Sequence, residues 1–219
     1  MALILHIEST TKNTSVAIAQ KGHCISLVEE VAKDYSHSQK LYRFITYALE
    51  GAKAKLGDLD AICIDKGPGS YTGLRIGSAI AKGLCFSLNI PLLAIDSLTI
   101  LTQGVSLEKA YFIAMMDARR QEVYSCVFDK DKKKKSPIEA TILHEKSFES
   151  YPIETTCMFG DGALKALDIL EKKFTYAPFL YPSSKDMIKE AYELFKEKKF
   201  EIMEDFEPFY LKDFMGNKL

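Results

Sequence analysis

Residues 67–77 read GPGSYTGLRIG and connect two segments of different character. The preceding run, Leu59–Ile64 (LDAICI), is apolar and of strand length, which predicts a buried strand. The following segment, Gly73–Leu88, is long and apolar enough to form a helix. The glycines mark a turn, and the hydroxyl of Ser70 or Thr72 can accept a backbone hydrogen bond as the helix N-cap. The stretch therefore predicts a strand, a glycine-rich turn and a helix.

Two interpretations of this turn stay open. Unpaired backbone N–H groups beside the positive end of a helix dipole can bind an anion. The spacing differs from that of a Walker loop, which needs four residues between two glycines and a following Lys. A purely structural strand-to-helix turn is therefore the favoured interpretation, and an anion site is the alternative.

The helix after the loop has an unusual surface. Gly73, Gly77 and Ala81 recur at every fourth position and form a smooth stripe. Apolar residues occupy the other faces, and few polar side chains interrupt them. A helix with so little polar surface is usually buried on more than one side. We therefore expect one side to face the core and another to face a partner.

The rest of the chain alternates between strand and helix patterns. The expected strands are Leu3–Ile7, Thr14–Ala19, Cys24–Val31, Leu59–Ile64, Ile90–Ile95, Tyr111–Met116, Glu122–Phe128, Glu139–Leu143, Thr155–Phe159 and Thr175–Phe179. The expected helices are Ser36–Leu56 with Ser36 or Ser38 as its cap, Gly73–Leu88, a segment from Asp96 to near Gly104, Leu164–Lys172 and Lys185–Lys198. This pattern predicts a mixed α/β fold.

The second half repeats the opening of the chain. In each half an apolar strand ends in a carboxylate, Glu8 or Asp117, and a polar hairpin follows. Such a recurrence suggests duplication. We expect two abutting lobes, residues 1–108 and 109–219, with an aromatic tail at the end of the second.

Composition indicates an ordinary soluble globular protein. The 219 residues are 47% hydrophobic and 27% charged, with a net charge of −1. No whole-molecule field attracts nucleic acid, so any contact with RNA needs a local patch or another subunit. The five cysteines are widely spaced and indicate reduced thiols. With no basic leader and no apolar run of membrane-spanning length, a cytoplasmic location is expected.

Four stretches together resemble one family. Besides GPGSYTGLRIG, they are ILHIESTTKNTSVAIA (Ile4–Ala19), MDARRQEVY (Met116–Tyr124) and PFYLKDF (Pro208–Phe214). They resemble TsaB, the non-catalytic partner subunit in the bacterial machinery that places threonylcarbamoyl on N6 of adenosine 37 of tRNA. The resemblance runs from end to end and implies an actin-like ATPase (ASKHA) fold with two duplicated lobes and a degenerate nucleotide site.

The resemblance also implies partners. The chain would bind and activate the catalytic subunit TsaD, with the ATPase TsaE joining and tRNA reached indirectly through the complex. Alone, it would form a homodimer. The contacts would come from the helices Ser36–Leu56 and Gly73–Leu88. The side chains expected at this interface are Leu41, Tyr42, Ile45, Gly73, Leu74, Gly77, Ile80 and Ala81.

The alternative is a stand-alone small-molecule kinase or ATPase of the actin-like class. Enzymes of this kind use two hairpins to hold a phosphate chain and magnesium. The hairpins here lack glycine, which disfavours this alternative. The candidate nucleotide- or anion-binding residues are Glu8, Ser9, Thr10, Asp117, Arg119 and Arg120.

No catalytic residue and no metal site is predicted. The four histidines never pair at helical spacing, and no nucleophile motif is present. The chain is expected to carry no cofactor of its own, and the sequence leaves open whether ATP or ADP with magnesium binds at the interface of the complex. The basic run 129–135 (DKDKKKK) is most simply a solvated hairpin tip, with contact to RNA as the alternative.

Overall fold

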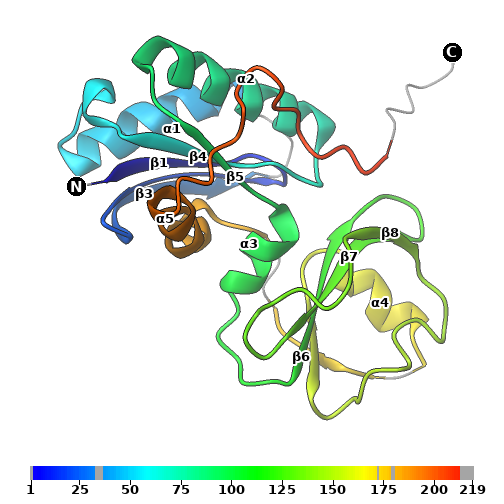
Figure 1. The fold of residues 1–219 in the computed structure, drawn as a ribbon. Coiled ribbons are helices and arrows are strands. Elements are labelled where there is room, and N and C mark those ends of the chain that lie inside the picture. Colours follow the sequence, from blue (N-terminus) through cyan, green and yellow to red (C-terminus); the bar gives the residue numbers. More distant parts are fainter. Residues whose placement is uncertain (1, 33–36, 172, 179–180, 213–219) are drawn as a thin grey trace, which may run out of the picture. The chain divides into compact units, whose positions relative to one another are not determined.

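The chain folds into two units, described separately (Figure 1). The structure, a computed structural model, describes residues 2–32, 37–171, 173–178 and 181–212. The first unit comprises Met1–Ile100 together with Pro182–Phe209. The second comprises Leu101–Tyr181 and the described residues of Tyr210–Leu219.

This division differs from the expected boundary between residues 108 and 109. The first unit ends earlier, at Ile100, and the chain returns to it at Pro182. The reason is that the helix α5 (Ile188–Lys196) packs on the first sheet and not on the second. Periodicity along the chain identifies this helix but carries no information about which sheet its apolar face covers.

The first unit is built on one mixed sheet. Its order is β3-β2-β1-β4-β5. The first three strands form an antiparallel meander, while β4 and β5 run parallel to β1. The strands are β1 (Leu3–Glu8), β2 (Asn13–Gln20), β3 (His23–Val31), β4 (Ala61–Asp65) and β5 (Leu92–Ile95).

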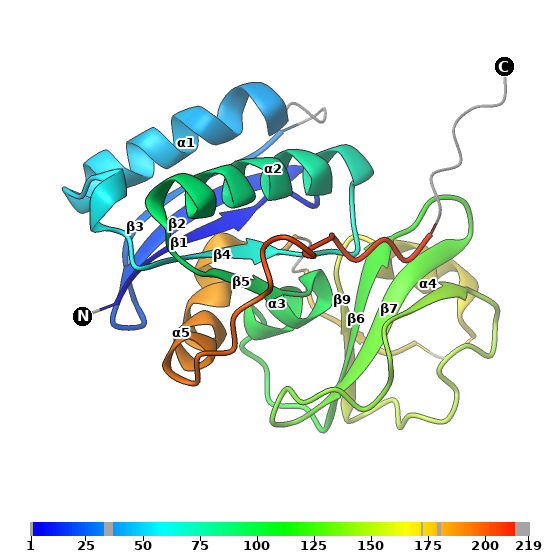
Figure 2. The ribbon, with the colours of Figure 1, turned by 45° about the horizontal axis from the view of Figure 1, so that its top comes forward.

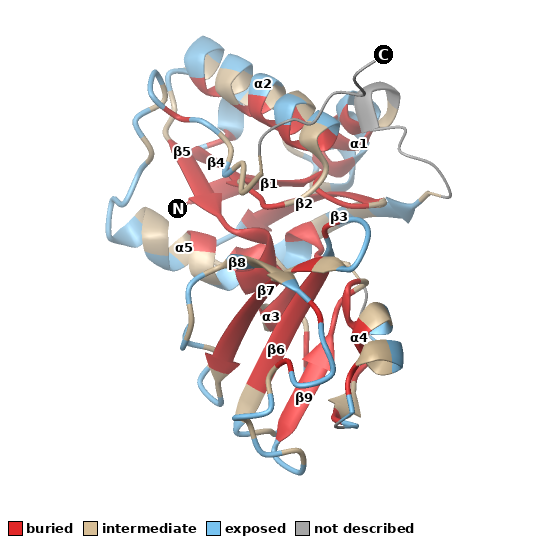
Figure 3. Ribbon diagram, turned by 90° about the vertical axis from the view of Figure 1, so that its right-hand side faces the viewer, coloured by how far each residue is buried: buried red, intermediate tan, exposed pale blue. Residues whose placement is uncertain are grey.

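Helices cover both faces of this sheet (Figure 2). On one face lie α1 (His37–Ala52) and α2 (Tyr71–Leu88), and on the other lies α5. Side chains alternate along β1, so Leu5 faces α1 and α2 while Ile4 faces α5. Both faces are therefore apolar, and the central strands are buried throughout, as Figure 3 shows.

Buried hydroxyls fix the returning segment to β2. Ser15 Oγ lies 2.6 Å from Ser184 Oγ, and the Ser184 N–H donates to Ser15 Oγ at 3.1 Å. Ser183 Oγ donates to Glu29 Oε2 at 2.6 Å, and Asn13 Nδ2 donates to the Pro182 carbonyl at 2.9 Å. These bonds satisfy polar groups that would otherwise be buried without partners. They place the short 3₁₀ turn Ser184–Met187 and then α5 against the sheet.

The second unit repeats the topology of the first. Its sheet has the order β10-β9-β6-β7-β8, with the same antiparallel meander followed by two parallel strands. The helix α4 packs against its core. The elements are α3 (Ser97–Gln103), which begins in the first unit, β6 (Tyr111–Asp117), β7 (Glu122–Asp129), β8 (Glu139–Ile142), β9 (Thr156–Phe159), α4 (Ala163–Ile169) and β10 (Thr175–Tyr176).

The expected fold class is confirmed. Both units hold a five-stranded mixed sheet with the same strand order, as a duplicated α/β chain requires. All ten expected strands and five helical segments are present, with small shifts at their ends. The first helix ends at Ala52 and not at Leu56, because Lys53 adopts a left-handed φ of 53°. Its expected cap Ser36 and the side chain of Ser38 lie outside what the structure describes.

The stripe of small residues on α2 packs against the first unit itself. A Cβ added to Gly73 would lie 1.9 Å from the carbonyl oxygen of Ser9. One added to Gly77 would lie 2.6 Å from Ser9 Oγ and 3.4 Å from Ile64 Cδ1. Ala81, one turn further on, is fully buried in the same core. The stripe therefore allows α2 to approach β1 and β4 closely.

Among the described residues, no helix combines the length and apolar character that crossing a lipid bilayer requires.

Replacing Gly73 by alanine should destabilise the chain by roughly 1–3 kcal/mol or more, because the added methyl group would displace the Ser9 carbonyl. Gly83 on the same helix is the matched control, since a Cβ there meets no atom within 4 Å. Gly83→Ala should stabilise the isolated chain by up to about 1 kcal/mol through helix propensity. Urea unfolding measures both changes. A wild-type unfolding midpoint for Gly73→Ala would contradict the close approach.

Candidate functional site

The first hairpin, which follows β1, packs directly against the glycine loop. The Ser70 N–H donates to the Thr10 carbonyl at 2.6 Å, and Ser9 Oγ donates to the Gly73 carbonyl at 3.0 Å. A Cβ added to Gly69 would lie 2.6 Å from Thr10. Ser70 caps α2, as expected, by accepting the Gly73 N–H at 3.2 Å. Backbone atoms of the first hairpin therefore occupy the position at which the sequence allows an anion. This favours the structural interpretation of the turn.

Beneath this hairpin lies a pair of buried carboxyl groups. Glu8 ends β1 and Asp65 ends the neighbouring parallel strand β4, and both are at most 1% exposed. Thr10 Oγ1 lies 2.6 Å from Glu8 Oε1 and 3.1 Å from Asp65 Oδ2. Because a hydroxyl carries one proton, it cannot donate to both carboxyl groups at once. The geometry therefore calls for a proton on one of the two carboxyls.

The pKa values agree with this requirement. Burial raises the pKa of Asp65 to about 7, against hydrogen bonds from Ser97 Oγ (2.6 Å) and the Gly67 N–H (2.8 Å) that favour its ionised form. Burial, reinforced by repulsion from Asp65, raises the pKa of Glu8 well above its usual range. Two carboxyls this close do not both ionise easily near neutral pH. Glu8 is thus a buried structural acid in this conformation and not an open magnesium ligand.

Sequence reasoning missed Asp65 and Ser97. A signal was present, since Asp65 ends a buried strand two residues before the glycine turn and Ser97 follows another strand. Carboxyl ends of parallel strands meet at one edge of a sheet, which brings these residues together.

A third buried titratable group lies on the same strand. His6 is fully buried between β2 and β4, and neither ring nitrogen makes a hydrogen bond of good geometry. Burial lowers its pKa to about 4, with weaker opposing effects from the backbone of Ala17 and Ile4. His6 is therefore neutral in the folded chain near neutral pH.

The second hairpin is exposed by contrast. The Lys165 ammonium donates to Asp117 Oδ1 at 2.8 Å, and the Arg119 N–H donates to the same oxygen at 2.6 Å. Arg119 and Arg120 are exposed and take left-handed φ angles of 68° and 51°. The backbone N–H of Asp117 donates to Asp161 Oδ1 at 2.9 Å. Burial raises the pKa of Asp161 to about 6.

Asp117 and Glu8, which occupy equivalent positions in the repeat, therefore differ in chemistry. Asp117 is an exposed side chain with a lysine partner, whereas Glu8 is buried and burial raises its pKa well above the usual range. Sequence reasoning missed Lys165 and Asp161, although the G-D-G turn before α4 marks the position of Asp161. Among the described residues, no three His, Cys, Asp or Glu side chains are arranged to hold a metal ion.

Most of the side chains expected at a partner interface lie inside the first unit. The aliphatic ones on α1 belong to its core, and so does the buried side of α2. Of the expected set, Tyr42 and Ile80 are not buried, and Ile45, although buried, also lines the groove described next. The six buried residues are Leu41, Ile45, Gly73, Leu74, Gly77 and Ala81.

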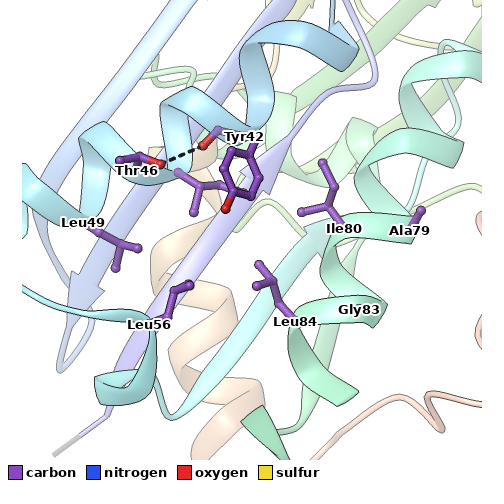
Figure 4. A pocket seen from close by; sticks show the side chains of 9 residues that line it. Tyr42, Thr46, Leu49, Leu56, Ala79, Ile80, Gly83 and Leu84 are labelled. Carbon is purple, nitrogen blue, oxygen red and sulfur yellow. Dashed lines mark hydrogen bonds between the residues drawn. The ribbon is translucent and has the colours of Figure 1, made fainter. Parts of the chain in front are cut away.

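The accessible surface between the two helices is an apolar groove, which we call the α1–α2 groove (Figure 4). Its cavity volume is about 230 Å³. Tyr42 is 67% exposed, and Thr46 Oγ1 donates to the Tyr42 carbonyl at 3.2 Å. The groove presents almost entirely carbon atoms. Its lining residues are Tyr42, Ile45, Thr46, Leu49, Leu56, Ala79, Ile80, Gly83 and Leu84.

Comparison with known proteins agrees with the fold and the motifs. The profile of the family described as TsaD, tRNA N6-adenosine threonylcarbamoyltransferase, matches residues 28–149. The tRNA threonylcarbamoyladenosine biosynthesis protein TsaB of Buchnera aphidicola (from Schizaphis graminum) is 31% identical, over 85% of this chain and 91% of its own length. The chain belongs to the TsaB family. The Escherichia coli TsaB is 27% identical, over 96% of this chain and 94% of its own length.

A solved structure extends the comparison to three dimensions. YeaZ from Pseudomonas aeruginosa superposes with a TM-score of 0.83 at 25% identity, covering 96% of this chain and all of the other. The likeness to a solved structure therefore extends over 96% of the chain, as does the match to the Escherichia coli TsaB.

Asp65 and His6 are buried groups whose pKa values are shifted in opposite directions, so they should change the pH dependence of stability in opposite senses. A raised pKa of Asp65 favours the folded state at low pH, and that stability is lost as the pH rises from about 4 to about 7. The lowered pKa of His6 acts oppositely, because its stability is present above pH 6.5 and is lost as the pH falls toward about 4.

Between pH 4.5 and 6.5, Asp65→Asn should therefore make the slope of unfolding free energy against pH more positive than in the wild type, by roughly 1.4 kcal/mol per pH unit. His6→Leu should make it more negative by a similar amount. Urea titrations across this range measure both slopes. Parallel slopes for the three proteins would show that neither group carries the proposed shift.

Proposed function

We propose that this TsaB-family protein is a non-catalytic subunit that binds the catalytic subunit TsaD through the α1–α2 groove. As a TsaB-family protein it takes part in threonylcarbamoyladenosine synthesis on tRNA. In this proposal it holds TsaD in the form that transfers threonylcarbamoyl to N6 of adenosine 37, and the ATPase TsaE joins the same assembly. The chain itself makes or breaks no bond of the substrate.

The observation that carries the proposal is the α1–α2 groove. Two adjacent helices leave a hollow lined by aliphatic side chains, with the exposed aromatic ring of Tyr42 at its edge. Phe86, on α2, is 78% exposed. An apolar hollow with an exposed aromatic ring at its edge is typical of protein-binding sites. A helix of a partner fits such a groove by placing apolar side chains at three- and four-residue spacing.

The same surface supports self-association of the isolated chain. A twofold pairing would bury the groove of one copy against α1 and α2 of another, since a twofold interface uses one patch on both subunits. Binding of TsaD and homodimer formation would then compete for the same residues.

The first hairpin supports an accessory role. Glu8 is buried with a pKa that burial raises well above its usual range, and the hydroxyls of Ser9 and Thr10 are used in internal hydrogen bonds. Magnesium and phosphate oxygens need accessible, ionised carboxylates and free donors. We therefore expect the chain alone to turn over no ATP. A nucleotide bound at the interface with TsaD is compatible with this proposal.

A charge in the groove should abolish both associations. Ala79 is exposed and lines the groove, so Ala79→Glu would place a carboxylate in a desolvated apolar contact, which costs several kcal/mol. We expect the dissociation constant for TsaD to rise at least 100-fold and the homodimer to dissociate. Calorimetry with TsaD and light scattering measure the two effects.

Ile202→Glu is the matched control, because Ile202 is a 66% exposed apolar residue of the same unit that does not line the groove. This variant should keep both associations. If Ala79→Glu binds TsaD and dimerises like the control, the groove is not the interface. Synthesis of modified adenosine in a reconstituted mixture should require the chain, and ATP turnover by the chain alone would instead support the kinase alternative.

A further inference from the structure

The basic run in the second unit forms a well-ordered turn, which we call the basic hairpin (residues 129–135). The Asp129 N–H donates to the Lys133 carbonyl at 2.9 Å, and the Lys135 N–H donates to the Val127 carbonyl at 2.7 Å. Asp129 Oδ1 also accepts the Lys133 N–H at 3.0 Å. One aspartate is thus used to shape the turn. The backbone of the hairpin tip is fixed by its own hydrogen bonds and presents its lysines in a defined arrangement.

One lysine of the hairpin has a structural role. Lys132 turns back, and its ammonium donates to the carbonyls of Gln103 (2.9 Å) and Val105 (2.8 Å). Gln103 is the last residue of α3, so Lys132 satisfies carbonyl groups at the negative end of a helix. This contact anchors the basic hairpin to the body of the second unit. The other lysines of the hairpin are exposed at the surface.

Three of these other lysines lack counter-charges. Lys130, Lys133 and Lys135 are exposed, and within the described part of the chain their ammonium groups pair with no carboxylate. The segment holds five lysines and two aspartates in a chain whose net charge is −1. Neighbouring like charges repel one another. Binding of a polyanion would neutralise them and so lower the free energy of the hairpin.

We propose that the basic hairpin binds the phosphate backbone of RNA, and that the chain thereby contacts tRNA directly. The identity of the polyanion as tRNA rests on the proposed function, whereas the binding of phosphates rests on the hairpin alone. Lysine ammonium groups bind phosphates as point charges and need no shaped pocket. Such contacts orient an RNA without reading its sequence.

Other polyanions fit the hairpin less well. A membrane surface usually requires an apolar or lipid anchor beside the basic cluster, and the residues 129–135 are all charged. A surface depression of about 530 Å³ adjoins Lys130, but its lining includes Glu108 and Glu154, whose carboxylates repel phosphates. The RNA surface is therefore confined to the exposed lysines of the hairpin tip.

The test compares two triple variants with the same change in charge. The hairpin variant is Lys130→Glu, Lys133→Glu and Lys135→Glu, which keeps Lys132 and its contacts with α3. The control is Lys53→Glu, Lys146→Glu and Lys189→Glu, three exposed lysines outside the hairpin. Fluorescence polarisation with labelled tRNA, at several salt concentrations, measures the affinity of the isolated chain and of its complex with TsaD.

We expect the hairpin variant to bind tRNA at least tenfold more weakly, and the salt dependence of log K to fall by about 2, as the loss of three phosphate contacts implies. The control should stay within twofold of the wild type. Equal losses in both variants, or none in either, would overturn the proposal. So would displacement of tRNA by polyglutamate at an equal concentration of charges, which would indicate unspecific attraction.

The outcome is distinguishable from a failure of the proposed function. The α1–α2 groove belongs to the first unit and the basic hairpin to the second, so the hairpin variant should bind TsaD with wild-type affinity. If the wild-type chain does not bind TsaD, the titration of the isolated chain with tRNA still decides whether the hairpin binds RNA.

Discussion

The first unit depends on the close approach between the first hairpin and the start of α2. The Ser9 carbonyl occupies the space that a side chain at position 73 would need, and Thr10 does the same at Gly69. This approach fixes the end of β1 over the end of β4. It buries Glu8 and Asp65 side by side, and the pair is tolerated because one proton and the hydroxyl of Thr10 lie between them.

The same approach decides which side of α2 stays accessible at the surface. Because the stripe of small residues faces β1 and β4, the side carrying Ala79, Ile80 and Gly83 is turned toward α1 and solvent. An amphipathic helix needs one apolar stripe for its own core. Ile80 and Leu84 pack partly against that core and also border the groove, so this side of α2 stays partly accessible, as the proposed partner contact requires.

Much of the fold followed from periodicity and turn residues. Strand–turn–helix order around the glycine loop, the duplicated hairpins and the family were all predicted and are confirmed. The placement of α5 was not, because an amphipathic stripe does not specify its partner sheet. The interface residues expected on α1 and α2 include the smooth stripe of α2 and several core side chains, since apolar character alone does not separate a core face from a docking face. A role for Asp65 was not predicted because it depends on Glu8, which lies on the neighbouring strand β1 and is distant in sequence.

The candidate site was less predictable for a related reason. Equivalent positions in the repeat, Glu8 and Asp117, carry the same kind of side chain in the sequence. Their chemistry differs because burial and neighbours differ, and these depend on contacts between distant segments. Asp117 is exposed and paired with Lys165, whereas Glu8 is buried beside Asp65 and shares the hydroxyl of Thr10 with it.

The discontinuous first unit has a consequence for synthesis of the chain on the ribosome. When the first hundred residues have emerged, the sheet face that carries Ile4, Cys63 and Leu93 still lacks the 3₁₀ turn with Met187 and the helix α5 with Ala191, which close it. This apolar face must stay exposed while some eighty further residues are translated. Nascent chains in that state are prone to associate or to recruit chaperones. The second unit, contained largely in one continuous segment, can complete its own core first.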